Sequence, residues 1–132
     1  MTFVDTNVLL DLVTDDPVHA DWSLAQLEAA ALRGPLVIGD IVYAELSVRY
    51  ARIEDLDAFV ARAGLRRAAM PDAALFLAGK AFASYRRSGG TRTGVLPDFF
   101  VGAQAALAER PLLTRDVRRY RTYFPSVELI AP

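Results

Sequence analysis

The sequence predicts an α/β fold, in which a central, mostly parallel sheet is covered by helices on both faces. Short apolar segments of strand length alternate along the 132 residues with longer segments of helical spacing. Connections between parallel strands are right-handed in almost all proteins. Ligands of such sheets bind beyond the carboxyl ends of the strands, where the strand order reverses. Side chains at those ends are therefore the candidates for function.

Each element follows from its residues. Asp16 and Pro17 suit the N-cap and first position of a helix, and Gly34 suits its end. Asp40 is expected to cap the helix that carries Glu45. The expected order is strand 2–4, helix 8–12, helix 16–33, strand 36–38, helix 40–48, helix 54–63, strand 65–70, helix 71–88, helix 97–108, strand 111–114 and strand 127–130. The glycine-rich stretch 88–94 is suited to an active-site loop.

The composition excludes several classes of protein. There is no cysteine, which excludes disulfide frameworks, zinc knuckles and thiol nucleophiles. No run of 18 apolar residues is present, and the start of the chain does not resemble a signal peptide. We therefore expect one cytoplasmic domain, residues 1–132, without a membrane span.

Hydropathy and charge leave two questions open. Hydrophobic residues make up 53% of the chain and the mean hydropathy is +0.22. This favours either a surface kept for a partner or a second copy, or an unusually dense core. The 15 basic residues are balanced by 16 acidic ones, so net charge does not indicate nucleic-acid binding.

Four carboxylates stand where such a sheet would gather them: Asp5, Glu45, Asp98 and Asp116. Two carboxylates ~5 Å apart repel by roughly 3 kcal/mol at an effective dielectric near 20. A group of four therefore needs a cation, and an all-oxygen set suits Mg²⁺ or Mn²⁺ better than Zn²⁺. Such an ion supports hydrolysis of a phosphodiester.

Each carboxylate has a plainer interpretation. Asp5 suits a helix N-cap, Asp98 a charge at the positive end of a helix, and Asp116 a turn. Glu45 suits a solvated helix face, although its apolar flanks argue against that. The functional hypothesis depends on the four together.

Other candidates are weaker. Four further aspartates are expected at solvated helix ends, namely Asp11, Asp15, Asp16 and Asp21. His19 is the only histidine and is expected to be exposed, so a Ser/His/Asp triad has no partner. The glycine-rich phosphate loops GxxxxGK[ST] and GxGxxG are absent.

The carboxylates lie in four segments that resemble the motifs of PIN domains. These are FVDTNVLL at 3–10, VYAEL at 42–46, LPDFFVGAQA at 96–105 and LTRD at 113–116 with its tail YRTYFP at 120–125. Short PIN domains of bacteria are mostly VapC-type toxins. The resemblance implies a five-stranded α/β/α sandwich and Mg²⁺- or Mn²⁺-dependent cleavage of RNA. It also implies a homodimer and a small VapB-like antitoxin that blocks the site.

The resemblance also implies roles for individual residues. Asp5, Glu45, Asp98 and Asp116 would bind the metal, and Asn7 and Thr114 would orient them or the water by hydrogen bonds. The arginines beside Asp116 and beside the loop could form a basic rim for the RNA backbone, or ordinary salt bridges. They are Arg86, Arg87, Arg92, Arg115, Arg118, Arg119 and Arg121. Tyr120, Tyr123 and Phe124 are expected to pack in the core rather than to stack on bases.

Three alternatives remain open. A PIN fold can serve as an interaction module without cutting, and a metal titration separates that reading from a nuclease. A housekeeping RNA-processing nuclease differs from a toxin in its neighbouring gene. A phosphate-transferring enzyme with Asp5 as nucleophile would require a second acid two residues on, where Asn7 stands.

Overall fold

The computed structural model describes residues 1–132 and contains a sheet of five strands in the order β3-β2-β1-β4-β5. All four strand pairings are parallel. The strands are short and lie at Thr2–Val4 (β1), Leu36–Ile38 (β2), Leu65–Arg67 (β3), Leu112–Leu113 (β4) and Leu129–Ile130 (β5). The predicted five-stranded α/β/α fold is therefore confirmed.

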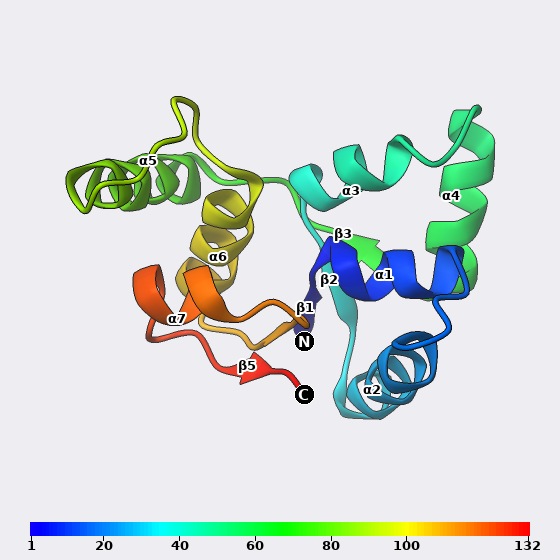
Figure 1. The fold of residues 1–132 in the computed structure, drawn as a ribbon. Helices are drawn as coiled ribbons and strands as arrows, with labels where there is room; N and C mark the ends of the chain where they lie inside the picture. The colour runs from blue at the N-terminus through cyan, green and yellow to red at the C-terminus, as the bar shows by residue number, and fades with distance from the viewer.

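Seven helices cover the sheet (Figure 1). They are α1 (Thr6–Val13), α2 (Ala20–Arg33), α3 (Asp40–Ser47), α4 (Ile53–Arg62), α5 (Asp72–Arg87), α6 (Pro97–Ala108) and α7 (Arg118–Tyr123). Figure 1 shows α1 to α4 on one side of the sheet and α5 to α7 on the other. This is the arrangement that right-handed crossovers produce when the chain winds outward from β1 in both directions.

The strand order reverses between β1 and β4, which pair directly with each other. The chain runs from β1 through β2 to the edge at β3, and then returns to β4 on the other side of β1. The carboxyl ends of β1 and β4 therefore flank the switch point of the sheet. Asp5 follows β1, and Thr114 follows β4.

Several predicted boundaries were wrong. The second helix begins at Ala20, because the Asp16 carboxylate accepts the N–H groups of Val18 and His19 and closes a separate turn. Asp40 is not a cap: Gly39 occupies that position, and the Asp40 side chain accepts the N–H of Met70.

Strand β3 ends at Arg67 rather than at residue 70, because Gln104 binds the carbonyl oxygens of Ala68 and Ala69. The six-residue helix α7 was not predicted at all. Its sequence is too short and too rich in arginine to show a helical period.

The apolar residues are divided between a core and a remainder at the surface. The core includes every residue of β2 and β4, which are at most 4% exposed. Several large apolar side chains nevertheless lie open to solvent: Val18, Leu32, Val48, Ile53 and Phe76, each at least 62% exposed. The high mean hydropathy is thus not explained by the core alone.

Candidate functional site

Asp5 lies at the centre of the site and is only 5% exposed. Its Oδ1 accepts the N–H of Thr6 at 2.8 Å, which makes it the N-cap of α1. Its Oδ2 accepts the hydroxyl groups of Tyr120 at 2.7 Å and Thr114 at 2.9 Å, and the amide of Asn7 at 3.3 Å. Asp5 is therefore both a cap and a buried carboxylate whose orientation is fixed by four donors.

The charge of Asp5 is costly in this position. Burial raises the pKa of Asp5 from 3.8 to about 6, although hydrogen bonds from Tyr120 and Thr114 act in the opposite direction. The negative charge of Asp98 raises the pKa further. A cation beside Asp5 would relieve both effects.

Glu45 reaches this region from α3. Its Oε1 accepts the hydroxyl of Thr6 at 2.7 Å, and Thr6 is the first residue of α1. The apolar flanks of Glu45 argued against a fully solvated position, and the hydroxyl of Thr6 is its hydrogen-bond partner. Thr6 was not singled out from the sequence, because a threonine at a helix start is common.

Asp98 occupies the first turn of α6, directly after Pro97. Its Oδ2 accepts Nη1 of Arg119 at 3.2 Å, and the two side chains are 26% and 38% exposed. Burial raises the pKa of the Tyr120 phenol far above its ordinary value, and the charges of Asp5, Asp98 and Glu45 add to this. The negative charges of Asp5, Asp98 and Glu45 are thus all close enough to affect one buried hydroxyl.

Asp116 is more exposed to solvent than Asp5, Glu45 and Asp98. Its side chain is exposed, and its Oδ1 accepts the N–H of Arg118 at 3.4 Å. Its own N–H donates to Oγ1 of Thr114 at 3.2 Å, which links it indirectly to Asp5. The structure therefore places Asp116 at the rim of the site, in a turn after β4.

Asn7 and Thr114 connect the ends of β1 and β4. The amide of Asn7 donates to Oγ1 of Thr114 at 3.1 Å, and its Oδ1 accepts the N–H of Arg115 at 3.0 Å. Both side chains also contact Asp5. These are the contacts that residues orienting Asp5 would make.

The prediction that Asp11 is solvated was wrong. Asp11 is 3% exposed and receives two hydrogen bonds from Arg115, at 2.6 and 2.9 Å, and one from Ser23 at 2.6 Å. Arg115 is consequently tied to α1 and does not belong to a free basic rim. The spacing of four residues between Asn7 and Asp11 places both on one face of α1. This spacing was the feature of the sequence that could have indicated that Asp11 faces the protein.

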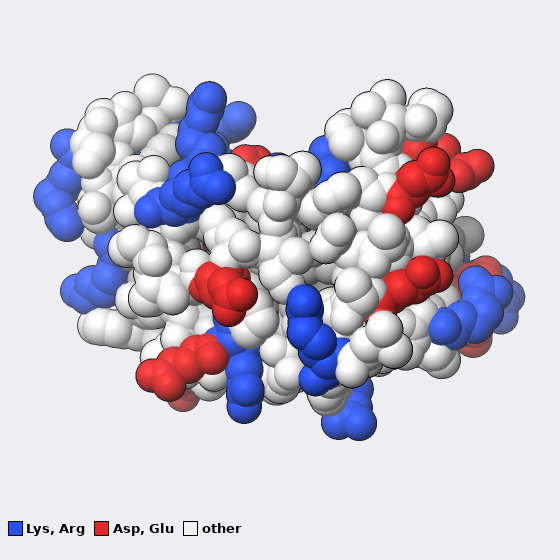
Figure 2. Space-filling view, turned by 90° about the horizontal axis from the view of Figure 1, so that it is seen from below, with Lys and Arg blue, Asp and Glu red and all other residues white.

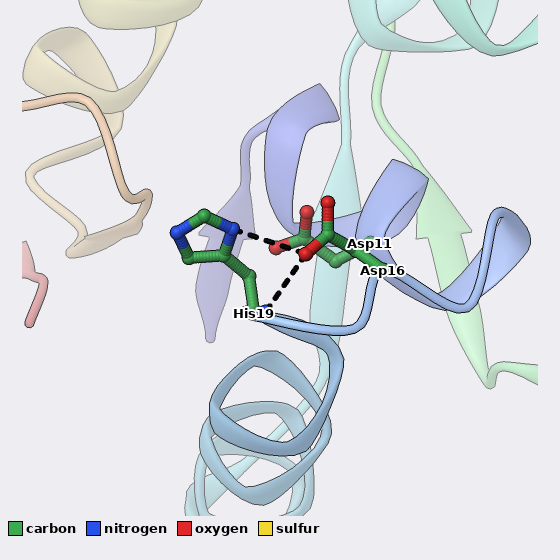
Figure 3. A group of neighbouring side chains, drawn as sticks. All are labelled: Asp11, Asp16 and His19. Carbon is green, nitrogen blue, oxygen red and sulfur yellow. Dashed lines mark hydrogen bonds and ion pairs between the residues drawn. The ribbon is translucent and has the colours of Figure 1, made fainter.

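Asp11 also takes part in a group with Asp16 and His19 (Figure 3). One ligand atom from each lies within 4.8 Å of the others, a spacing that no three of the four predicted carboxylates meet. However, Asp11 is already engaged by Arg115, and Oδ1 of Asp16 already accepts two backbone N–H groups and faces Nδ1 of His19 at 3.2 Å. A cation there would compete with a guanidinium, so we assign none.

The acids around Asp5 fit a divalent cation better. They offer only oxygen donors, as Mg²⁺ and Mn²⁺ prefer. Burial already raises the pKa of Asp5, and only Arg119 forms an ion pair with any of Asp5, Glu45 and Asp98. Binding a cation would require these side chains to draw closer than they are without one.

The other arginines near the loop and Asp116 are either bonded within the protein or exposed without an ion pair. Arg86 donates to the carbonyl oxygens of Gly90 and Arg92 and so holds the loop after α5. Arg87, Arg118 and Arg121 are exposed and form no ion pair. The face seen from below in Figure 2 mixes basic and acidic side chains without a continuous basic patch.

Comparison with known proteins gives a family and a fold. The profile of the PIN domain matches residues 2–125. A search of the curated proteins found no match. No helix has the length and apolar character needed to cross a membrane.

Three solved structures illustrate the similarity. One is VapBC2 from Rickettsia felis bound to a DNA fragment from its promoter. It gives a TM-score of 0.74 at 18% identity, and the match covers 98% of this chain and 97% of that one. DNA-bound VapBC from Salmonella typhimurium gives 0.69 at 17% identity, over 98% and 96%. A toxin–antitoxin complex from Klebsiella pneumoniae gives 0.65 at 22% identity, over 96% and 95%. At these identities the likeness concerns the fold.

Proposed function

Because the chain belongs to the PIN domain family, whose members are nucleases, we propose that it is a metal-dependent endoribonuclease of the VapC type. Residues 1–132 would form one PIN domain that acts in the cytoplasm as the toxin of a toxin–antitoxin pair. The observation that carries this proposal is the buried carboxylate of Asp5 at the switch point of the sheet. The charges of Asp98 and Glu45 are close enough to raise the pKa of Tyr120, whose hydroxyl donates to Asp5.

Asp5, Glu45, Asp98 and Asp116 would hold Mg²⁺ or Mn²⁺. When bound, such an ion supplies an activated water and neutralises charge on the phosphoryl oxygens. Asn7 and Thr114 hold the Asp5 carboxylate in place, through contacts of 3.3 and 2.9 Å. The burial of Asp5 excludes water from the inner side of the site.

The RNA backbone would be held by arginines that are not engaged elsewhere. Arg87, Arg118 and Arg121 are exposed, and the last two lie in α7, shortly after Asp116. Each phosphate contact adds to the salt dependence of binding. Arg115 and Arg86 are not part of this set, because their guanidinium groups are bound within the protein.

The test is cleavage of total RNA by the purified protein, freed of any partner, in Mg²⁺ or Mn²⁺, with the cut ends mapped by sequencing. We expect discrete cuts that disappear with EDTA, with Asp98→Asn and with Glu45→Gln. The matched control is Asp21→Asn, an exposed acid in the first turn of α2. Cutting that survives EDTA would contradict the proposal, and metal binding without cutting of a broad RNA panel would favour the interaction module.

The partner would be a small antitoxin, because the similar solved structures include a toxin–antitoxin complex and a VapBC complex. An apolar groove of about 220 Å³ runs between α1, α2 and α4, and is lined by Leu9, Leu12, Leu24, Leu27, Glu28, Ala31, Leu36, Arg62, Ala63 and Leu65. Grooves of this kind accept the apolar face of a helix. We propose that the antitoxin places such a segment here.

A pair of matched variants tests this docking. Leu24 lines the groove, whereas Leu32 on the same helix does not and is 91% exposed. Leu24→Glu is expected to abolish co-purification with the product of the adjacent small gene, and Leu32→Glu to leave it intact. If no small gene adjoins this one, the housekeeping nuclease becomes the better interpretation.

A homodimer is the remaining part of the proposal. Exposed Phe76 and Leu75 on α5, at 68% and 43%, offer apolar surface that a second copy could cover. Light scattering on the isolated chain should give twice the 14.5 kDa of one copy. A monomer at all concentrations would exclude the homodimer and leave the nuclease proposal untouched.

A further inference from the structure

The hydroxyl of Tyr120 has a role that packing does not explain. The Tyr120 side chain is 1% exposed and belongs to the apolar core. A phenylalanine would fill the same space, and a buried hydroxyl is costly unless it is bonded. The Tyr120 hydroxyl makes one hydrogen bond, to Oδ2 of Asp5 at 2.7 Å, across 115 residues of sequence.

The donors around Asp5 are unevenly distributed. Oδ2 faces three donors, from Tyr120, Thr114 and Asn7, at 2.7, 2.9 and 3.3 Å. Oδ1 faces one donor, the N–H of Thr6 at 2.8 Å. Since a carboxylate oxygen accepts about two hydrogen bonds, Oδ2 is filled and Oδ1 retains an acceptor position.

Among the three donors to Oδ2, Tyr120 is the one that bonds to Asp5 alone. Thr114 has a single hydroxyl proton, and the carbonyl oxygen of Asp116 lies within its reach at 3.2 Å. The amide of Asn7 is shared with Oγ1 of Thr114. Tyr120 has no competing acceptor, and its bond to Asp5 is the shortest of the four.

We propose that Tyr120 is a positioning residue, whose hydroxyl fixes Oδ2 of Asp5 so that Oδ1 remains available to a divalent cation. This inference rests on the proposed metal-dependent nuclease function. The short helix α7 then has a purpose beyond covering the sheet, because it delivers this hydroxyl to the end of β1.

The test compares Tyr120→Phe with Tyr123→Phe, a second tyrosine of α7 whose hydroxyl makes no hydrogen bond and whose ring packs against Phe99. Mn²⁺ affinity is measured by electron paramagnetic resonance, and kcat and KM by cleavage of an RNA oligonucleotide. We expect Tyr120→Phe to weaken Mn²⁺ binding and lower kcat by about tenfold each, as loss of a partner to a metal ligand commonly does. KM should stay unchanged, and Tyr123→Phe should behave as wild type.

Wild-type Mn²⁺ affinity and kcat in Tyr120→Phe would overturn the inference while leaving the nuclease proposal standing. If the wild-type protein binds Mn²⁺ but cuts no RNA, the nuclease proposal fails, and the affinity ratio of the two variants still decides the role of Tyr120. Absence of Mn²⁺ binding by the wild-type protein would overturn both.

Discussion

Substituting Asp5 should make the protein more stable in the absence of metal. The folded state raises the pKa of Asp5 from 3.8 to about 6, so at pH 7 the ionised group costs the fold about 3 kcal/mol. Asp5→Asn removes that charge and keeps the shape of the side chain. In Asp5→Asn the new side-chain NH₂ group faces Nδ2 of Asn7, which is also a donor, so this hydrogen bond is lost. The loss should reduce the gain in stability by roughly 1 kcal/mol. The expected net gain is about 2 kcal/mol.

The assay is urea unfolding in EDTA, with Asp11→Asn as the matched control. Both aspartates are buried and both lie at or in α1, but Asp11 is paired with Arg115 and Asp5 has no cation. The change from Asp to Asn should therefore raise the free energy of unfolding at position 5 and lower it at position 11. Asp11→Asn is expected to cost about 2–3 kcal/mol, toward the low end for a broken buried pair because Arg115 is 24% exposed.

The stability of the wild type should also depend on pH through Asp5. Because the folded state holds the Asp5 proton more tightly, this group stabilises the wild type below pH 4, and the benefit is lost as pH rises through about 6. The advantage of Asp5→Asn should therefore vanish near pH 4. If Asp5→Asn unfolds at lower urea than wild type in EDTA at pH 7, the account of Asp5 as an uncompensated buried charge is refuted.

Three other perturbations test contacts in the site and in the core. Thr6→Val should cost about 1–2 kcal/mol in urea unfolding, because Glu45 loses the hydroxyl that it accepts; a neutral result would mean that water replaces it. Gly102→Ala should cost about 1–3 kcal/mol in thermal unfolding, since a Cβ there would collide with the ring of Phe124. Mg²⁺ at 100 times its Kd should stabilise the wild type by about 2.7 kcal/mol and Asp5→Asn far less; equal stabilisation would place the ion elsewhere.

The topology was predictable because it depends on patterns that survive in short segments. Apolar strands such as 36–38 and helix stop signals such as Gly34, the C-cap of α2, are local properties of the chain. The positions of Asp5 and Asp98 followed from the rule that strand ends and helix starts share one edge. Asn7 and Thr114 were indicated only by the resemblance to PIN domains, and both contact Asp5 in the structure.

The contacts that cross the fold were not predictable. Tyr120 lies at an apolar position and was assigned to the core, which is correct for its ring; nothing in the sequence indicates that its hydroxyl meets Asp5. Asp11 was assigned to solvent because its partner Arg115 lies 104 residues away. Asp116 was grouped with the other acids, but nothing in the sequence indicated that its side chain is exposed.

The most direct test of the central claim is to locate the metal by titrating Mn²⁺ into wild type, Asp98→Asn and Asp16→Asn, with binding read by electron paramagnetic resonance. Asp98 belongs to the acids around Asp5, and Asp16 to the separate group with Asp11 and His19. Loss of a ligand should weaken binding by at least about tenfold in Asp98→Asn, while Asp16→Asn should bind as wild type. Unchanged affinity in Asp98→Asn together with lost affinity in Asp16→Asn would contradict the assignment of the site.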